Sequence, residues 1–295
     1  MFIVNHRKLF FILSGILVGG SVVSMFVFGL PLGIDFKGGS LLEVSYTTTR
    51  PSLETVKPNL DKLNLGAYVL TPSGDLKYSL KTRDLTPAEK TTIETALSQD
   101  ANIAKEEGFT SIGPVVGSQL KNKALMAIIL VIIAIVLFIT FAFRKVSRPV
   151  ASWKYGLATI VALAHDVIIP TGVFITWAHF YGGEVDLLFV TALLAILGYS
   201  VHDTIVVFDR VRENLRVGNK NESFTETVGA SVTQTFGRSI NTSLTIFLAL
   251  VALYFIGGSS TKDFAFVLLI GIITGTYSSI FVASPLLVTL EKLQK

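Results

Sequence analysis

Six stretches of the chain are long and apolar enough to cross a membrane as helices, since a spanning helix needs about 20 mostly apolar residues. Four of them contain no charged side chain: residues 9–30, 124–143, 239–257 and 264–290. The other two, residues 155–180 and 187–208, each contain a His-Asp dipeptide. The pattern predicts an α-helical membrane protein with six transmembrane helices. The first stays in place as an anchor, because its apolar run exceeds the roughly 7–15 residues of a signal peptide.

The basic residues predict how these helices are oriented. Positive charges gather in the connections after residues 143 and 208, whereas the connections near residues 181–186 and 258–263 hold few of them. Because short cytoplasmic loops carry an excess of Lys and Arg, both termini are expected in the cytoplasm and residues 31–121 outside it. The basic residues concerned are Arg144, Lys145, Arg148, Lys154, Arg210, Arg212, Arg216, Lys220 and Arg238.

The long segment between the first two spans is expected to fold as a domain of its own. Thr86, followed by a proline and by Glu89, forms a capping box that starts a helix. The predicted order is strand, helix, strand, strand, helix, strand, which is that of a ferredoxin-like α+β unit. The expected ranges are residues 39–48, 52–63, 67–71, 76–81, 87–99 and 108–116. The chain thus divides into residues 1–30 (cytoplasmic N-terminus and first span), 31–121 (extracytoplasmic domain) and 122–295 (five-helix bundle).

Composition narrows the function classes. Of 295 residues, 51% are apolar and only 16% are charged, against roughly 25% charged in an ordinary soluble domain. This argues against a soluble enzyme. The absence of cysteine excludes disulfides, thiolate metal sites and a cysteine nucleophile. The net charge of +4 comes from dispersed residues that fit topology signals, so nucleic-acid binding is not expected.

Glycines mark two kinds of structural motif. Pairs spaced four residues apart, Gly15 with Gly19 and Gly271 with Gly275, predict close helix packing, and further small residues follow Gly275. Glycine- and proline-rich segments also stand at both ends of the outer domain and are expected to shape its first strand and to act as hinges. Their residues are Gly33, Asp35, Gly38, Gly39, Gly113, Pro114 and Gly117.

The two His-Asp pairs are the candidate functional residues. A charge in lipid costs about 2.5–3.5 kcal/mol on insertion scales, so packing alone does not explain Asp166 and Asp203. Adjacent helical residues point about 100° apart, so His165 and His202 are expected on different faces from their aspartates. At 1.5 Å per residue, the depths of the two aspartates differ by about 9 Å, which suits a proton relay through the inner half of the bilayer.

Two other interpretations of these residues stay open. The polar side chains could serve only to tether helices by hydrogen bonds, or they could perform chemistry as a His/Asp metal site or as two aspartates sharing a proton. Neither His-Asp pair has a second histidine three or four residues away. We therefore expect no metal, no cofactor and no enzymatic activity.

Six motifs together resemble the SecD/SecF family of bacterial protein-export membrane proteins, within the resistance-nodulation-division superfamily. The resemblance spans essentially the whole chain, and the motif at residues 198–214 is the most specific. The motifs are GIDFKGG (33–39), SIGPVVG (111–117), AHDV (164–167), GYSVHDTIVVFDRVREN (198–214), RSINT (238–242) and GTYSSIFVASP (275–285).

The resemblance implies a subunit that pairs with SecD in the bacterial inner membrane. It implies late, ATP-independent translocation of unfolded exported polypeptides through the SecYEG channel, driven by the proton motive force, with YajC, YidC and membrane lipids as further partners. It also implies that Asp203 and Arg238 transport protons. The family often has Asn-Asp where this chain has His202-Asp203. The expected proton pathway comprises Asp203, Arg238, His202, Asp166 and His165.

An exporter of lipids or small molecules, driven by protons and drawn from the same superfamily, is the alternative function. An intramembrane hydrolase comes third.

Overall fold

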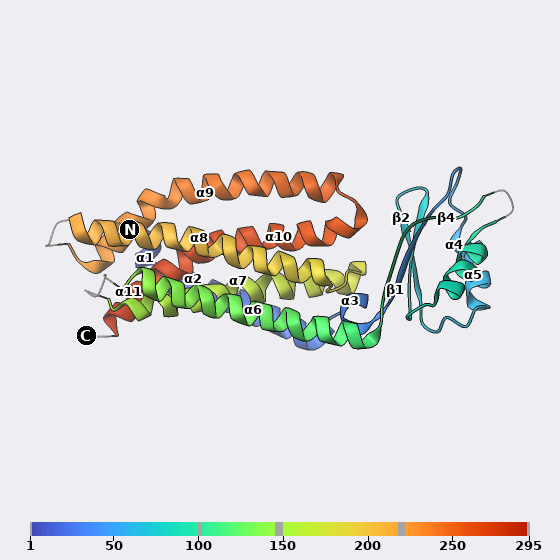
Figure 1. The fold of residues 1–295 in the computed structure, drawn as a ribbon. Coiled ribbons are helices and arrows are strands. Elements are labelled where there is room, and N and C mark those ends of the chain that lie inside the picture. The colour runs from blue at the N-terminus through green and yellow to red at the C-terminus, as the bar shows by residue number, and fades with distance from the viewer. Residues whose placement is uncertain (1, 100–101, 145–149, 218–221, 294–295) are drawn as a thin grey trace. The chain divides into compact units, whose positions relative to one another are not determined.

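The computed structural model describes residues 2–99, 102–144, 150–217 and 222–293 (Figure 1). Lys145, Arg148 and Lys220, which contributed to the predicted orientation, lie outside the described residues. The chain divides into two compact units. We call Met1–Pro31 with Met126–Lys295 the membrane unit, and Leu32–Leu125 the sheet unit.

The membrane unit consists of long helices. Six helical segments among the described residues are long and apolar enough to cross a membrane, the last being Thr261–Lys292. The helices are α1 (Phe2–Asn5), α2 (Arg7–Phe28), α6 (Pro114–Ala142, which begins in the sheet unit), α7 (Ser152–Tyr181), α8 (Leu187–Val217), α9 (Phe224–Ile256), α10 (Ser259–Tyr277), the π-helical turn η1 (Ser278–Ala283) and α11 (Ser284–Lys292).

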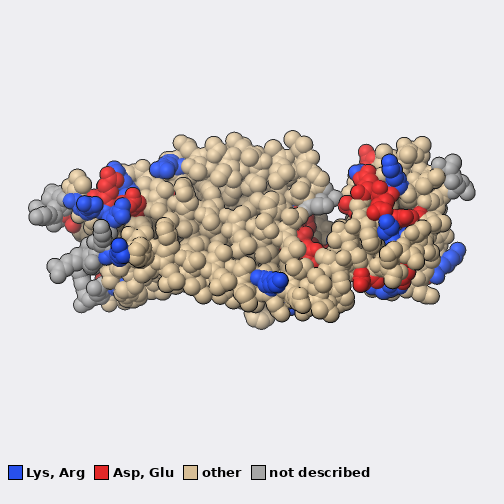
Figure 2. Space-filling model, viewed as in Figure 1, with Lys and Arg blue, Asp and Glu red and all other residues tan. Residues whose placement is uncertain are grey.

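These helices differ in burial. More than half of the most apolar stretch is buried in α7, in α8 and in the last span, but less than a fifth in α2, α6 and α9. Exposed side chains of α2, α6 and α9 include many large apolar residues. On the face shown in Figure 2, a wide area of the membrane unit carries no charged side chain. An apolar exterior of this kind suits a lipid environment.

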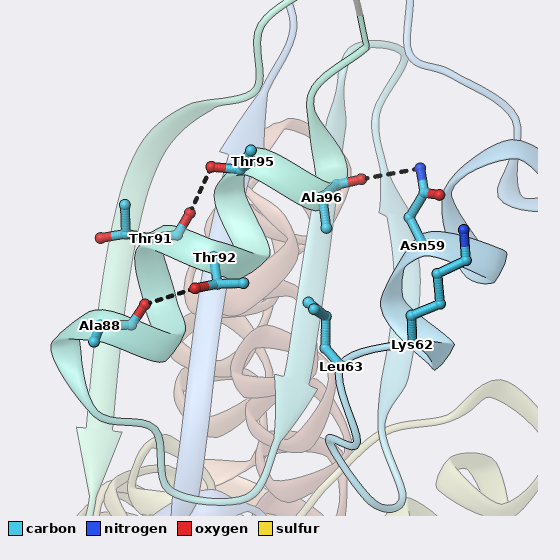
Figure 3. A pocket seen from close by; sticks show the side chains of 8 residues that line it. All are labelled: Asn59, Lys62, Leu63, Ala88, Thr91, Thr92, Thr95 and Ala96. Carbon is cyan, nitrogen blue, oxygen red and sulfur yellow. Dashed lines mark hydrogen bonds between the residues drawn. The ribbon is translucent and has the colours of Figure 1, made fainter.

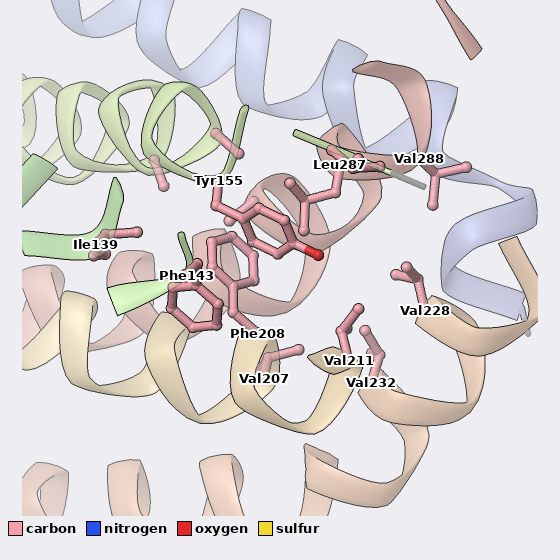
Figure 4. Close-up of a cluster of buried hydrophobic side chains, with 14 of the residues drawn as sticks. Ile139, Phe143, Tyr155, Val207, Phe208, Val211, Val228, Val232, Leu287 and Val288 are labelled. Atoms are coloured by element: carbon pink, nitrogen blue, oxygen red, sulfur yellow. The ribbon is translucent and has the colours of Figure 1, made fainter. Parts of the chain in front are cut away.

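An aromatic cluster joins the helices near one end of the membrane unit (Figure 4). The rings of Phe143 and Tyr155 stack with centroids 5.2 Å apart, and both meet Phe208 edge-on. Val232 of α9 and Leu287 of α11 are buried in the same cluster. The cluster therefore fixes α7 and α8 against α9 and the end of the last span.

One of the two predicted glycine pairs brings helices close together within this chain. A methyl group at Gly271 would collide with Ile196, and one at Gly275 would lie 3.1 Å from Cβ of Ser200, so both glycines let α10 approach α8. A methyl group at Gly15 or Gly19 would meet nothing within 4 Å. The glycine that lets α2 approach α7 is instead Gly172, which faces Ser21 and which the spacing rule does not find.

The sheet unit contains one antiparallel sheet of four strands in the order β2-β3-β1-β4. β1 pairs with β3 in the register Leu42↔Leu80, and with β4 in the register Leu42↔Phe109 with an irregularity at Glu43/Val44. The elements are α3 (Ile34–Lys37), β1 (Gly39–Ser45), α4 (Leu53–Asp61), β2 (Val69–Ser73), β3 (Lys77–Thr82), α5 (Pro87–Leu97) and β4 (Lys105–Ile112).

Alternating side chains of the strands bury one face of this sheet. Leu42, Val44 and Leu80 pack in one cluster with Val56 of α4 and Ile93 of α5. A period of two on the strands and one apolar stripe on each helix give this two-layer packing.

Several elements extend beyond or stop short of the apolar or alternating pattern that predicted them. β2 continues through Pro72, which is tolerated because β2 is an edge strand. β4 ends at Ile112, because Pro114 begins α6. α9 begins at Phe224 and not near residue 239, because Ser223 and Glu226 form a capping box. A hydropathy pattern predicts only the part of a helix that crosses the lipid. The helix itself, with its backbone hydrogen bonds, can extend beyond the lipid into water.

The start of α5 predicts a dependence of stability on acid. Glu89 accepts hydrogen bonds from Arg83 at 2.5 Å and from the backbone N–H of Thr86 at 2.9 Å. These contacts lower the pKa of Glu89 to about 2, Arg83 being the largest cause. Because the folded-state pKa is depressed, this stabilisation is present above about pH 4.5 and is lost as the pH falls towards 2.

We expect Glu89→Gln to weaken the protection of α5 amides at neutral pH and to flatten its decline between about pH 5 and pH 2. Amide hydrogen exchange of the full chain measures this. Glu54→Gln is the matched control, because the Ser52 side chain does not cap a backbone N–H of α4 and instead lies 2.7 Å from the Thr55 hydroxyl. A decline as steep in Glu89→Gln as in the unmodified chain would contradict the assignment.

Candidate functional site

A fully buried carboxylate connects three helices inside the membrane unit. Asp166 of α7 has no exposed surface. Its Oδ1 lies 2.9 Å from Nδ1 of His165, and its Oδ2 accepts hydrogen bonds from Ser278 Oγ at 2.7 Å and from Ser200 Oγ. All three neighbours can donate, which is the set of partners that an ionised carboxylate requires.

The π-helical turn η1 supplies one of these donors. Ser278, its first residue, donates to Asp166, and the next residue, Ser279, donates to the carbonyl of Ser200 at 3.2 Å. The hydroxyls of Ser279 and Thr204 lie 2.7 Å apart. π-Helical turns are rare and often occur at functional sites. Here the turn directs two consecutive hydroxyls at α7 and α8.

The second carboxylate, Asp203 of α8, has fewer partners. It is 6% exposed, and its Oδ1 accepts a hydrogen bond from Ser239 of α9 at 2.6 Å. Its Oδ2 is buried and has no hydrogen-bond partner among the described residues. A buried charged oxygen without a partner is expensive. Of the two carboxyls, Asp203 is therefore the better suited to hold a proton.

A series of neighbouring hydroxyl groups leads from Ser239, the partner of Asp203, to α10. Ser243 Oγ donates to the carbonyl of Ser239 at 2.7 Å, and lies 2.6 Å from Tyr199 Oη and 2.5 Å from Thr276 Oγ1. Sequence reasoning treated the Ser and Thr residues after Gly275 as packing residues only. Their run at residues 274–279 is the signal that could have indicated a polar interior.

No hydrogen bond or ion pair joins Arg238 to the Asp203 carboxylate: among the described residues Oδ1 accepts from Ser239 and Oδ2 has no partner. Arg238 lies well inside α9 and lines a cavity of about 390 Å³ between α8 and α9. Arg210, Glu213 and Gln234 also line it, and Arg210 donates to both of the others at 2.6 Å. Arg238 thus lines a polar cavity and directly precedes Ser239, the residue that donates a hydrogen bond to Asp203.

The two histidines occupy different surroundings. His202 is exposed while Asp203 is buried, as the 100° rotation between adjacent residues predicts. In α7 the expectation of separate directions is wrong, because His165 and Asp166 are hydrogen-bonded to each other. Rotation about their side-chain bonds brings the two groups together although their Cα–Cβ bonds point in different directions. His165 thereby belongs to the Asp166 site.

The glycine-rich segments at the two ends of the sheet unit contact each other. A methyl group at Gly38 would lie 2.7 Å from Cα of Pro114, and one at Gly117 would lie 2.9 Å from the backbone nitrogen of Gly38. A methyl group at Gly39 would lie 2.6 Å from the carbonyl oxygen of Thr82. Gly33 and Asp35 lie at the start of α3, and Gly113 immediately precedes α6. The glycines permit backbone contact between α3 and the start of α6.

Gly38→Ala is expected to destabilise the sheet unit well beyond the effect of an ordinary glycine substitution. Gly38 has a φ of +80° and its methyl group would also meet the backbone of Pro114, so strain of about 1 kcal/mol or more adds to a steric clash. Gly74→Ala is the control, because its φ is +61° with nothing within 4 Å. Thermal unfolding of the full chain in detergent measures both. Equal shifts in the two variants would contradict the contact.

A cavity of about 800 Å³ lies between α4 and α5 in the sheet unit (Figure 3). Thr91, Thr92 and Thr95 line it, but their hydroxyls donate to carbonyls of their own helix. None of the predicted site residues lines it. Across the part of the chain that the structure describes, no three His, Asp or Glu side chains gather as metal ligands would.

The fold and the site define a multi-pass membrane protein with two buried carboxyls among hydroxyl groups. Comparison with protein families matches residues 92–293 to the family described as protein export membrane protein SecD/SecF, C-terminal, and residues 23–49 to the SecD/SecF GG motif. The chain belongs to the SecD/SecF family.

Individual relatives cover nearly the whole chain. The protein translocase subunit SecF of Thermobaculum terrenum is 41% identical and is aligned over 98% of this chain and 93% of its own length. The protein translocase subunit SecDF of Brucella abortus is 36% identical over 97% of this chain, which spans 37% of that longer protein. The crystal structure of SecDF from Thermus thermophilus, described as a translocon-associated membrane protein, matches 98% of this chain with a TM-score of 0.83 and 31% identity, and the chain spans 38% of it.

Proposed function

We propose that the chain is a SecF-type subunit of the protein translocase and acts together with a SecD partner. Support comes from the names of its relatives, which are translocase subunits aligned over almost all of this chain. In Brucella abortus and Thermus thermophilus the matching segment is part of a longer SecDF chain. A segment that is fused to a second one in relatives is expected to bind that second segment when the two are separate.

The proposal also covers the topology of the chain in the membrane. The sheet unit is an extracytoplasmic ferredoxin-like domain, supported by its element order β1-α4-β2-β3-α5-β4 and its sheet order. The domain comprises residues 31–121, the five-helix bundle 122–295, and both termini face the cytoplasm of a bacterium across its inner membrane. Arg144, Arg210, Arg212 and Arg216 support this orientation.

The function of the membrane unit is proton transport along Asp203, Arg238, His202, Asp166 and His165, coupled to the movement of an exported polypeptide. The observation that carries this proposal is the Asp203 carboxyl, which is buried among helices and has one oxygen without a partner in the described parts of the chain. A carboxyl in that setting can take up and release a proton as its surroundings change. Asp166, whose three neighbours can all donate, can take up a proton from His165 through their hydrogen bond.

The subunit promotes late, ATP-independent translocation of unfolded polypeptides through SecYEG, with YajC and YidC as associated proteins, and performs no enzymatic step. The translocase names of its relatives support protein export over export of lipids or small molecules.

Co-purification tests this function. An affinity-tagged form of the chain, expressed with the SecD homologue of the same genome, is expected to bring down that homologue in roughly equal amount, and SecYEG in smaller amount, in mild detergent. The matched control is a tagged chain of another membrane protein from the same cells. Recovery of neither SecD nor SecYEG would contradict the proposal and would favour the exporter.

A further inference from the structure

A lateral cavity of about 440 Å³ lies between α2 and α7 in the membrane unit. Its walls come from α2, α7, the turn η1 and α11, and are apolar except at Ser14 and His165. The volume falls within the range of about 300–1,000 Å³ that small-molecule sites occupy. A cavity so lined offers water few hydrogen bonds, whereas a hydrocarbon group fits it.

His165 gives this cavity a polar anchor. Its side chain lines the cavity, is 4% exposed and, within the described residues, makes one hydrogen bond, between Nδ1 and Asp166. Its Nε2 is buried and has no hydrogen-bond partner among the described residues. A buried polar atom without a partner is rare in native proteins, so Nε2 calls for a partner from outside the described residues.

The hydrogen-bond pattern defines what that partner must supply. When Asp166 is ionised, both of its oxygens accept, so Oδ2 takes the hydroxyl donors and Oδ1 accepts from Nδ1–H of His165. In the neutral ring, Nε2 is then an acceptor. Ser14 Oγ, on the opposite wall, donates its own proton to Tyr277 Oη at 3.3 Å and can accept another. Nε2 of His165 and Oγ of Ser14 can therefore each accept a hydrogen bond from a ligand.

We propose that this cavity binds an amphiphile with a hydrocarbon body and a single hydroxyl group, which enters from the lipid bilayer and donates its hydroxyl proton to Nε2 of His165. Such a ligand would lie beside Tyr277, whose ring stacks on His165 at a centroid distance of 5.8 Å and whose hydroxyl donates to the carbonyl of Phe10 at 3.0 Å. An occupant thus touches the side chains that connect α2 to the Asp166 site.

Photolabelling of the full chain in lipid nanodiscs tests the proposal. The probe is a dodecanol that carries a diazirine on its chain, and the matched probe is the same diazirine-bearing dodecane without the hydroxyl. Gly15→Leu and Ala164→Leu fill the cavity from opposite walls, and both positions are exposed, so the fold should tolerate them. Gly19→Leu is the matched control, since Gly19 is one turn away on α2 and does not line the cavity.

In the unmodified chain and in Gly19→Leu, the alcohol should label α2 and α7 about fivefold more strongly than the hydrocarbon, as one hydrogen bond predicts. The two filling variants should lose this labelling. His165→Phe, which keeps a ring but removes both nitrogens, Nε2 included, should be labelled equally by both probes. Equal labelling of the unmodified chain by both probes, or undiminished labelling of both filling variants, would overturn the proposal. Neither result bears on proton transport at Asp203, because the readout is binding alone.

Discussion

Asp203→Asn is expected to abolish proton-dependent polypeptide export while the protein still assembles normally. The amide keeps the shape of the carboxyl, and its oxygen can still accept the hydrogen bond that Ser239 donates at 2.6 Å. Its nitrogen replaces Oδ2, for which the described residues supply no hydrogen-bond partner. One unpartnered buried polar atom thus replaces another, so the protein should still fold, but an amide cannot bind and release a proton. Export of a secreted reporter by inverted membrane vesicles, with ATP removed after initiation, measures the effect.

Asp209→Asn is the control for this substitution. Asp209 lies on the same helix, is exposed, and pairs with Arg212 at the surface, so its loss should be worth no more than about 1 kcal/mol. Export should continue normally in this variant. If Asp203→Asn also exported at the unmodified rate, the proposed role of Asp203 would be wrong.

Asp166→Asn is expected to reduce both stability and proton transport. The carboxylate accepts from Ser278 and Ser200 on Oδ2 and faces His165 on Oδ1. An amide has only one accepting oxygen, so at least one of these neighbours would face an N–H group. Leaving a buried polar group unsatisfied costs about 1–3 kcal/mol. Thermal unfolding in detergent and proton flux in proteoliposomes measure the two effects.

Ser278→Ala separates the structural role of this site from a role in transport. It removes one of the two hydroxyl donors on Oδ2 but keeps the carboxyl, so stability should fall by about 1 kcal/mol while proton flux persists. If Asp166 had only a structural role, the Asp166→Asn molecules that remain folded would show normal proton flux. That outcome would remove Asp166 and His165 from the proposed pathway.

The sequence predicts the six apolar helices because lipid demands a long run of apolar residues, and that demand is local in sequence. The ends of α9 and β4 were less predictable. Hydropathy does not register a helix that continues through charged residues, and the capping box Ser223 with Glu226 is the local signal that marks the start of α9. Likewise, the alternation near residues 108–116 does not reveal that Pro114 already begins α6.

The aspartates were found as candidates because a charge in an apolar run is locally conspicuous. Their partners were not, since Ser200, Ser239 and Ser278 come from three different elements and meet the carboxyls only in the folded chain. The contact between Gly38 and Pro114 is of the same kind. Spacing within one helix cannot predict which residues of other helices approach it.

Proton flux is the most direct test of the central claim that Asp203 carries protons across the membrane. A membrane potential of about 100 mV supplies about 2.3 kcal/mol per charge, which suffices to drive a buried carboxyl through a protonation cycle. Proteoliposomes that hold the chain with its SecD homologue, and a pH-sensitive dye inside, should acidify or alkalinise under an imposed potential. Vesicles with Asp203→Asn should respond no faster than protein-free vesicles. A flux equal to that of the unmodified chain would contradict the account.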